Sequence, residues 1–424
     1  MTDYKLLNHK NNKLYYGYII ASSAFFIQML GLGSYITYGV FFNSFLTEFA
    51  WSRAMISGAS SLFFFMCGLL GILAGRLVDK IGPRIVMTGC GIFLGSGYML
   101  MSQIQSVWQL YLFYGLIVAI GNSAIDVGTL STIARWFTRI RGTMTGTIKV
   151  GAGVGMLLMP LVTNWLISSY GWRTSYIIIG GVLLVFLVVA SQFLRRDPSK
   201  IGLLPDGDKR TNISKFSPEE GGVSLQKAVQ TRQFWMLCVM WLSFGFCLQT
   251  VMIHSAPYAV DIGASPSTAA SILSIIGGVS IAGRFIMGGA SDKIGNKRAY
   301  IICFSCLTIA FITILIIHES WVLYLFAVAY AFGHGGLWSL LSPIIAELFG
   351  IASHGAIFGL VYFVSTIGGT IGPILAGYIF DITGSYQIVF STCLIFSIIA
   401  VILSACLTPT TYPKAKRIYS IFRE

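Results

Sequence analysis

Charged residues are scarce in this chain of 424 residues. Only 10% of them are Asp, Glu, Lys or Arg, whereas a soluble domain carries roughly 25%. Hydrophobic residues make up 55% of the chain. These proportions exclude an ordinary soluble protein. They predict an all-α membrane protein with many transmembrane helices, whose surroundings are the lipid bilayer.

The sequence also lacks the motifs that mark pumps and metalloenzymes. It has no GxxxxGK[ST] phosphate-binding loop, which argues against transport driven by ATP. It has no HExxH-like spacing, and its one CxxC, Cys303 and Cys306, lies among Ile, Leu and Phe residues. We therefore expect no metal site, no cofactor and no enzymatic activity.

Acidic residues are few, so the net charge is +13, but the basic residues are not arranged for nucleic acid. Most of them fall in the polar segments expected on one side of a membrane, whereas Arg53 and Arg173 are expected on the other side. This asymmetry is the positive-inside pattern. It predicts a multi-pass protein of the cell (inner or plasma) membrane with both termini in the cytoplasm.

Twelve apolar segments are long enough to cross a hydrocarbon core about 30 Å thick as helices. The expected spans are 16–45, 54–78, 85–103, 108–134, 142–167, 174–194, 233–259, 267–290, 299–317, 321–347, 354–380 and 386–407. Between the sixth and seventh spans, residues 195–232 contain eight Lys and Arg, three prolines and no apolar periodicity. This composition is typical of a linker. We therefore expect an N-terminal half at 1–194, a cytoplasmic linker at 195–232, a C-terminal half at 233–407 and a cytoplasmic tail at 408–424.

A repeated pattern relates the two expected halves. The tetrapeptide DKIG occurs at 79–82 and again at 292–295, 213 residues later. The sequence ARWF at 134–137 corresponds to AELF at 346–349, and at the same displacement Asn122 corresponds to His334. Duplicated halves of six helices with a binding site between them are typical of secondary transporters.

Several of these motifs resemble those of the major facilitator superfamily. GILAGRLVDKIGPR at 71–84 and GRFIMGGASDKIGNKR at 283–298 resemble the loop motif that follows helices 2 and 8 of that superfamily. YYGY at 15–18, GAGVG at 151–155 and GWR at 171–173 resemble its branch of monocarboxylate porters and oxalate/formate antiporters. The resemblance implies twelve transmembrane helices in two pseudo-symmetric six-helix halves, and a small organic anion as substrate.

Arg284 is the lone charge in the apolar stretch 269–290. A charge inside a membrane costs at least about 2.5 kcal/mol on insertion scales. Ser274, Gly277 and Ser280 share its helical face, which therefore suits a ligand or water better than lipid. The resemblance implies that Arg284 binds the substrate carboxylate. The alternative is an arginine that reaches the surface or pairs within the bundle.

Asp126 and Lys149 lie at similar depths in the neighbouring antiparallel spans four and five, so we expect them to pair. The pair could be purely structural, or Lys149 could add a second positive charge for the substrate. His254, in the outer half of span seven, is implied by the resemblance as a substrate contact, and its titration range would suit a proton carrier. A histidine bonded to a backbone carbonyl is the alternative.

The remaining candidates are polar or aromatic. Asn122 could bind substrate or join two helices. Four tyrosines are candidates for the cavity wall, with packing between helices as the alternative. Four charged residues at inner helix ends are implied by the resemblance as a cytoplasmic gate, with simple surface turns as the alternative. The tyrosines are Tyr35, Tyr38, Tyr330 and Tyr362, and the gate residues are Asp79, Arg135, Asp292 and Glu347.

We therefore expect a monomeric secondary transporter that moves a monocarboxylate, such as lactate or pyruvate, with a proton by alternating access. A dicarboxylate or carboxylate/carboxylate exchanger of the oxalate/formate kind is the alternative. However, span eleven lacks the lysine of the oxalate/formate pattern, and Ser280 replaces the acidic residue that some relatives carry before the arginine. A proton site would therefore lie elsewhere, with His254 and Asp126 as the candidates. A membrane-embedded enzyme, a channel or a receptor is less favoured.

Overall fold

The computed structural model describes residues 15–49, 51–207, 222–263, 266–316 and 321–408. These residues are almost entirely helical. The helices of the first half are α1 Tyr16–Ile36, α2 Tyr38–Phe49, α3 Arg53–Ile81, α4 Pro83–Met101, α5 Val107–Leu110, the π-helix η1 Tyr111–Val118, α6 Ala119–Ser123, α7 Ile125–Trp136 and α8 Arg141–Gln192. Then come the 3-10 turns η2 Pro198–Ile201 and η3 Pro205–Gly207, and α9 Leu225–Ala228. The helices of the second half are α10 Arg232–Asp261, α11 Pro266–Ile294, α12 Asn296–Ile316, α13 Val322–Phe349, α14 His354–Thr383 and α15 Gln387–Cys406.

Eleven of the described helical segments are long and apolar enough to cross a membrane, and one of them supplies two crossings. This segment, α8, has 52 residues, but Gly171 inside it has φ 77° and ψ 161°. Such a conformation is accessible to glycine and strained for other residues. The part before Gly171 packs against α1, where Gly151 approaches Phe25, and the part after it packs against α4, where Gly95 approaches Leu184. The described chain therefore makes the twelve predicted crossings.

Two of the crossings are not continuous α-helices. The first is broken at Thr37, between α1 and α2. The fourth consists of α5, η1, α6 and α7 in succession, and η1 is a π-helix of eight residues. π-Helical turns occur frequently at functional sites. Here the π-helix directly precedes the segment that carries Asn122 and Asp126.

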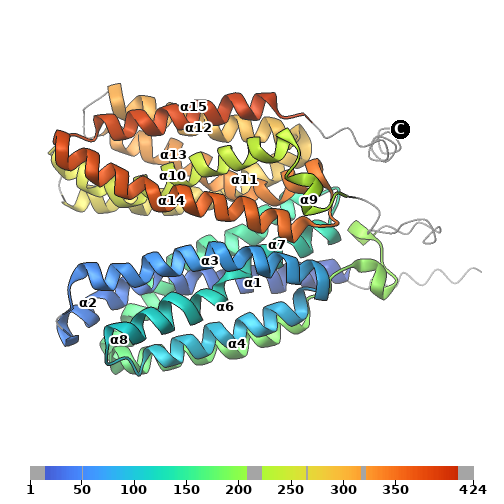
Figure 1. The fold of residues 1–424 in the computed structure, drawn as a ribbon, viewed down its shortest axis with the longest axis horizontal. Coiled ribbons are helices and arrows are strands. Elements are labelled where there is room, and N and C mark those ends of the chain that lie inside the picture. The colour runs from blue at the N-terminus through green and yellow to red at the C-terminus, as the bar shows by residue number, and fades with distance from the viewer. Residues whose placement is uncertain (1–14, 50, 208–221, 264–265, 317–320, 409–424) are drawn as a thin grey trace, which may run out of the picture.

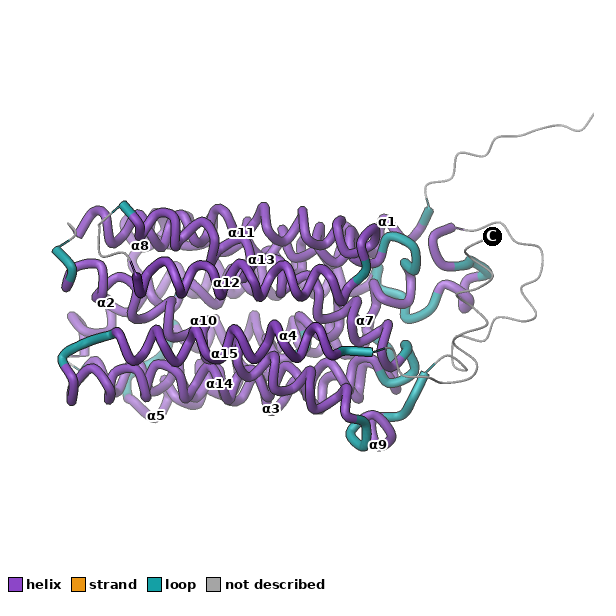
Figure 2. Tube along the Cα trace, turned by 90° about the horizontal axis from the view of Figure 1, so that it is seen from above, coloured by secondary structure: helices purple, strands orange, loops and turns teal. Residues whose placement is uncertain are grey.

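The long helices form two layers, α1 to α8 in one and α10 to α15 in the other (Figure 1). A perpendicular view shows that they all run between the same two ends of the molecule (Figure 2). Across the boundary between the layers, α3 packs against α14 and α8 packs against α11. This is the predicted all-α architecture of two six-helix halves.

The linker segments 195–207 and 222–231 lie at the end of the bundle where α1 begins and α15 ends (Figure 1). We call this the linker end. Asp206 accepts hydrogen bonds from the backbone N–H groups of Thr138 and Arg139, both 3.0 Å long. The backbone N–H of Val223 donates to the Phe349 carbonyl at 2.9 Å. One part of the linker is thus fixed to the first half, and the other part to the second half.

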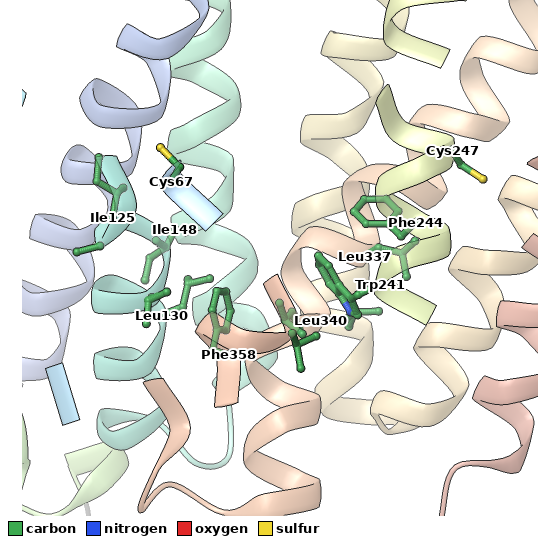
Figure 3. Packing of buried hydrophobic residues seen from close by; sticks show 14 of the residues in the cluster. Cys67, Ile125, Leu130, Ile148, Trp241, Phe244, Cys247, Leu337, Leu340 and Phe358 are labelled. Atoms are coloured by element: carbon green, nitrogen blue, oxygen red, sulfur yellow. The ribbon is translucent and has the colours of Figure 1, made fainter. Parts of the chain in front are cut away.

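Apolar side chains fill the interior of each half. In Figure 3, Ile125, Leu130 and Ile148 lie in the first half, while Trp241 and Phe244 lie in the second. The outer faces of the helices are also apolar, as the exposure of many Leu, Ile, Val and Phe side chains shows. Apolar residues on both the inside and the outside of a helix bundle are typical of a protein surrounded by lipid.

Candidate functional site

Three charged side chains are buried in the middle of the bundle: Arg284 on α11, Lys149 on α8 and Asp126 on α7. Each lies eight to ten residues from the linker end of its helix, or about 12–15 Å at the helical rise per residue. Lys149 Nζ forms an ion pair with Asp126 Oδ1. Arg284 Nη1 donates a hydrogen bond of 3.2 Å to the backbone carbonyl of Lys149. The predicted pair of Asp126 and Lys149 and the separately predicted Arg284 therefore form one cluster, which joins the two halves.

The formal charge of this cluster is +1, because one carboxylate faces two cations. A buried charge without a counter-charge is costly. Arg284 supplies the excess, since Asp126 pairs directly with Lys149 and the Arg284 Nε atom has no hydrogen-bond partner among the described residues. The cluster is thus suited to bind one negative charge, and a planar guanidinium matches a carboxylate in shape.

Gln28 is a fourth member of this cluster. Its Nε2 atom donates 2.8 Å hydrogen bonds to Asp126 Oδ1 and to Thr129 Oγ1. Asp126 is therefore held in place from α1 as well as from α8. Gln28 is visible in the sequence as a polar residue inside the first span, but nothing in the sequence connects it with a residue almost one hundred positions later.

Close packing between α8 and α11 fixes the position of Arg284. A Cβ atom at Gly146 would lie 2.5 Å from the Arg284 carbonyl oxygen, and one at Gly153 would lie 2.6 Å from its Nη1 atom. On the other side, Ser339 Oγ of α13 donates a 2.8 Å hydrogen bond to the same carbonyl. Small residues on α8 thus let the arginine lie directly against the opposite half.

This packing ends just beyond Arg284. Gly277 lies seven residues earlier on the same face of α11, and a Cβ atom there would meet nothing within 4 Å. In the corresponding part of α8, the side chains of Leu161 and Trp165 are 65% and 59% exposed. Helices α8 and α11 are therefore in contact from the linker end up to Arg284, and α11 faces open space beyond it.

Trp338 and His334 extend the cluster along α13. The Lys149 Nζ atom lies 4.8 Å from the centre of a Trp338 ring. The Trp338 Nε1–H donates a 3.0 Å hydrogen bond to His334 Nε2. The sequence contained a signal for this pair, because residues four apart on a helix are neighbours.

Asn122 and two of the predicted tyrosines lie in the first half. Asn122 Nδ2 donates to the Gly31 carbonyl at 3.1 Å and so joins α6 to α1. The Tyr38 hydroxyl donates to the Ile56 carbonyl at 2.7 Å. Tyr35 is half-buried and stacks on Phe63. Asn122 and Tyr38 thus already have protein partners, and their contact with substrate remains a prediction.

The other two tyrosines differ from each other in surroundings. Tyr330 is fully buried on α13, and its hydroxyl has no hydrogen-bond partner among the described residues. Tyr362 on α14 lies near Trp338, with ring centres 6.1 Å apart. Of the four tyrosines, Tyr362 is the one whose ring lies beside Trp338, the side chain that contacts Lys149.

His254 lies apart from the cluster, toward the end opposite the linker. Its Nδ1 atom is 3.1 Å from the Tyr386 hydroxyl, and its Nε2 atom is 3.1 Å from the Pro373 carbonyl oxygen. Both ring nitrogens thus have protein partners. This is the carbonyl-bonded arrangement named above as the alternative, and a substrate contact by His254 remains a prediction.

Asp79 and Arg135 connect the two halves at the linker end. The Asp79 carboxylate accepts hydrogen bonds from the backbone N–H groups of Gly355 and Ala356, at 3.2 and 2.9 Å. Arg135 forms an ion pair with Asp79 at 3.2 Å and donates to the Ile351 carbonyl at 2.7 Å. Asp79 thus reaches from the first half to the start of α14, and Arg135 reaches Ile351, just before α14 begins.

Asp292 makes the corresponding connection from the second half to the first. Its carboxylate accepts 2.7 Å hydrogen bonds from the backbone N–H groups of Gly142 and Thr143 at the start of α8. Glu347 differs from the other three predicted gate residues, because its carboxylate accepts a 2.6 Å hydrogen bond from Asn296 of its own half. Three of the four thus reach across the boundary between the halves in the contacts that the structure shows.

Comparison with known proteins gives a consistent family assignment. The sequence model of the Major Facilitator Superfamily matches residues 24–289 and 252–423. Monocarboxylate transporter 13 of Rattus norvegicus is 28% identical over 377 residues, covering 88% of this chain and 84% of the relative. Monocarboxylate transporter 12 of Homo sapiens is 23% identical, covering 89% and 78%.

Solved structures of the same architecture are also similar. The Escherichia coli fucose:proton symporter superposes with a TM-score of 0.72 at 14% identity, covering 93% of this chain and 98% of that chain. The human organic anion transporter MFSD10 superposes with a TM-score of 0.69 at 15% identity, covering 92% and 99%. At these identities, the superpositions establish the fold alone.

Proposed function

The chain belongs to the Major Facilitator Superfamily, and we propose that it moves a small monocarboxylate, such as lactate or pyruvate, together with a proton by alternating access. As a member of this family it is a transporter and not an enzyme. The observation that carries the proposal is the excess positive charge of Arg284 in the buried cluster. The names of its relatives, monocarboxylate transporters 12 and 13, support the same substrate class.

The balance of charges favours a monoanion over a dianion. A monocarboxylate beside Arg284 brings the cluster of Arg284, Lys149 and Asp126 to zero formal charge. A dicarboxylate would bring it to −1, and burial of a net charge is costly. An oxalate/formate-like exchanger would need Lys149 to leave Asp126 and face the substrate, which makes it the second candidate.

The contacts between the halves support the alternating-access part of the proposal. Helices α8 and α11 touch at the linker end and separate beyond Arg284, so the substrate would reach Arg284 from the opposite end. If the linker is cytoplasmic, this arrangement faces outward. A single copy contains both halves, and we propose that the monomer transports.

Asp126 is our candidate for the proton site. A proton on its carboxylate would raise the charge of the cluster from +1 to +2, and a bound anion would then be held more strongly. The preference for a monoanion therefore applies to the state in which Asp126 is ionised. Proton and substrate would thus favour each other's binding, as symport requires. His254 is less suitable, because its contacts with Tyr386 and Pro373 occupy both ring nitrogens.

The test is uptake of labelled lactate into proteoliposomes by variants of Arg284. Arg284→Lys keeps the charge but loses the planar pair of donors, so affinity should fall roughly ten- to a hundredfold, the equivalent of about 1.5–3 kcal/mol. Arg284→Ala should abolish uptake while the protein still folds, because its removal lowers the cost of insertion. Arg76→Ala, which removes an exposed arginine of α3, is the matched control and should transport normally.

The folding check is the elution profile of each purified variant on a size-exclusion column. A well-folded Arg284→Ala variant that transports at the parental rate and affinity would contradict the proposal. The orientation has its own test in cells. A cysteine at Lys200 in the linker should resist an impermeant reagent added from outside, and labelling there would show that the proposed cytoplasmic side is wrong.

A further inference from the structure

The protonation pattern of His334 follows from its contact with Trp338. An indole N–H can only donate, so at 3.0 Å from Trp338 Nε1 the His334 Nε2 atom must accept. The proton of the neutral ring is therefore on Nδ1, and His334 would have to give up this hydrogen bond to become charged. The contact thus fixes His334 as a neutral donor.

The Nδ1–H group of His334 has no acceptor in the part of the chain that the structure describes. His334 is only 5% exposed, and Nδ1 has no hydrogen-bond partner among the described residues. The ring stacks against Phe244 on one helix and against Tyr330 one turn earlier on its own helix. These rings restrict its rotation, and a buried donor without an acceptor is unfavourable. The group is therefore suited to an acceptor brought by a ligand.

The position of His334 connects it with the anion site. Trp338, which sets its tautomer, also lies under Lys149 Nζ at 4.8 Å. The Lys149 carbonyl accepts the hydrogen bond from Arg284, and α13 is joined to Arg284 through Ser339. The Nδ1–H donor of His334 and the excess positive charge of Arg284 thus belong to one continuous group of contacting residues.

We propose that His334 is a substrate-binding residue that selects monocarboxylates with an oxygen on C2, and that its Nδ1–H donates to this 2-oxo or 2-hydroxy oxygen while Arg284 holds the carboxylate. This inference rests on the proposed function and names its substrate class more narrowly. A site built to donate to an oxygen discriminates strongly against an analogue without it, because the donor is then left unpaired. Pyruvate and lactate carry this oxygen, and propionate has the same carbon skeleton without it.

The test compares pyruvate, lactate and propionate as competitors of labelled pyruvate in proteoliposomes. The parental protein should prefer pyruvate and lactate over propionate by about tenfold or more. His334→Phe keeps a flat ring between Phe244 and Tyr330 but removes the donor. This variant should weaken the binding of pyruvate and lactate, while the affinity for propionate should stay within about twofold of the parental value. The ratio of the affinities should therefore approach one.

Two further variants test the role of the fixed donor. His334→Gln retains an N–H donor and should keep part of the preference. Trp338→Phe removes the N–H group that donates to His334 Nε2, so the proton of the neutral ring is no longer restricted to Nδ1. This variant should reduce the preference for pyruvate and lactate over propionate without abolishing it. A thermal unfolding profile of each variant shows that it is folded.

Three results would overturn the inference: a parental protein that does not distinguish propionate from pyruvate, a folded His334→Phe variant with the parental ratio, or equal losses for all three substrates. The parental comparison needs no variant, so it decides even if His334→Phe fails to fold. If the parental protein binds none of the three acids, the proposed function itself has failed, which is a separate and recognisable outcome.

Discussion

Asp79 and Asp292, 213 positions apart in the sequence, bind the first backbone N–H groups of helices in opposite halves. Asp79 on α3 accepts from Gly355 and Ala356 at the start of α14. Asp292 on α11 accepts from Gly142 and Thr143 at the start of α8. A carboxylate at a helix N-terminus satisfies unpaired N–H groups and opposes the positive end of the helix dipole. Each half thus uses the equivalent residue to hold the other half at the linker end.

Loss of either carboxylate charge should favour opening at the linker end. Hydrogen bonds to a charged group are worth about 1.5–3 kcal/mol, so Asp79→Asn should shift the balance between open and closed forms by about tenfold. Asp292→Asn should have a smaller effect, because Asp292 is exposed and solvent screens its charge. The measurement is the distance between spin labels at Lys80→Cys and Lys293→Cys, with Cys406→Ser to remove the exposed thiol.

Asp206→Asn is the matched control for this experiment. Asp206 also accepts from two backbone N–H groups, those of Thr138 and Arg139, but it joins the linker to the first half only. Its replacement should leave the distance between the spin labels unchanged. An Asp79→Asn variant with the parental distance distribution would show that this contact does not hold the halves together.

Glycines at the same interface should be needed for transport. A Cβ atom at Gly75 would lie 2.5 Å from the backbone carbon of Gly355, and one at Gly288 would lie 2.6 Å from the Gly142 carbonyl oxygen. Gly75→Ala and Gly288→Ala should therefore prevent close approach at the linker end and reduce uptake by about tenfold or more. Gly278→Ala is the control, because its Cβ would meet nothing within 4 Å.

Alanine is better than glycine in a helix interior by about 1 kcal/mol, so all three variants gain the same local preference. A difference in uptake between them therefore reports the contact between the halves. Equal uptake by Gly75→Ala and Gly278→Ala would show that the close packing of the linker end is not required in the transport cycle.

The sequence predicted the spans well, because length and hydropathy largely determine which segments can cross a membrane. The tenth span, predicted at 321–347, is α13, Val322–Phe349. The contact between Asp126 and Lys149 was also expected, because the two residues share a depth on neighbouring antiparallel helices. The linker-side ends of the second and eighth spans were visible in the repeated DKIG motif, although the partners of its aspartates were not.

The connections of the site were less predictable. Arg284 donates to a backbone carbonyl of the opposite half, and such a contact leaves no trace in a single sequence because any residue has a carbonyl. Gln28 reaches Asp126 from a helix far away in the chain. These contacts depend on how the helices pack within a half and between the halves, which hydropathy does not encode. The pair of Trp338 and His334 was within reach of sequence reasoning, since both lie on one helix at a spacing of four.

Glu48 should make stability depend on pH at the end opposite the linker. It accepts hydrogen bonds from Trp172 Nε1 at 2.5 Å and from Arg173 Nη2 at 2.6 Å. Partial burial raises the pKa of its carboxyl, but the two hydrogen bonds and the charge of Arg173 outweigh this and lower the pKa below its usual value. A lowered pKa in the folded state means that the stabilisation is present above the unfolded value, about 4.3. It is lost as the pH falls through the lower, folded value.

Thermal unfolding of the parental protein and of Glu48→Gln should show this dependence. At pH 6 the parental protein should melt at a slightly higher temperature, by a modest amount because the pair is 40% exposed. At pH values below the lowered pKa of Glu48 the two melting temperatures should converge, since its carboxyl is then protonated. A constant difference between the two proteins across this range would rule out a contribution from the Glu48 charge.

The last prediction concerns the ion pair of Asp126 and Lys149. Asp126→Asn leaves Lys149 and Arg284 as two buried cations without a counter-charge, and loss of one partner of a buried pair costs about 3–5 kcal/mol. Lys149→Leu leaves Asp126 free to attract Arg284 and so to compete with the substrate anion. Each single variant should therefore be impaired. The double variant restores the formal charge of +1 and should recover stability and binding of a monocarboxylate.

Uptake driven by a proton gradient then separates a structural pair from a proton-coupling site. If Asp126 carries the proton, the double variant should bind and exchange lactate but should no longer respond to a pH gradient across the proteoliposome membrane. If the double variant retains the parental response, the proton is carried elsewhere and the pair is structural. If instead Lys149→Leu alone keeps monocarboxylate uptake and loses dicarboxylate uptake, the lysine contacts substrate, and the charge balance on which the monocarboxylate proposal depends is wrong.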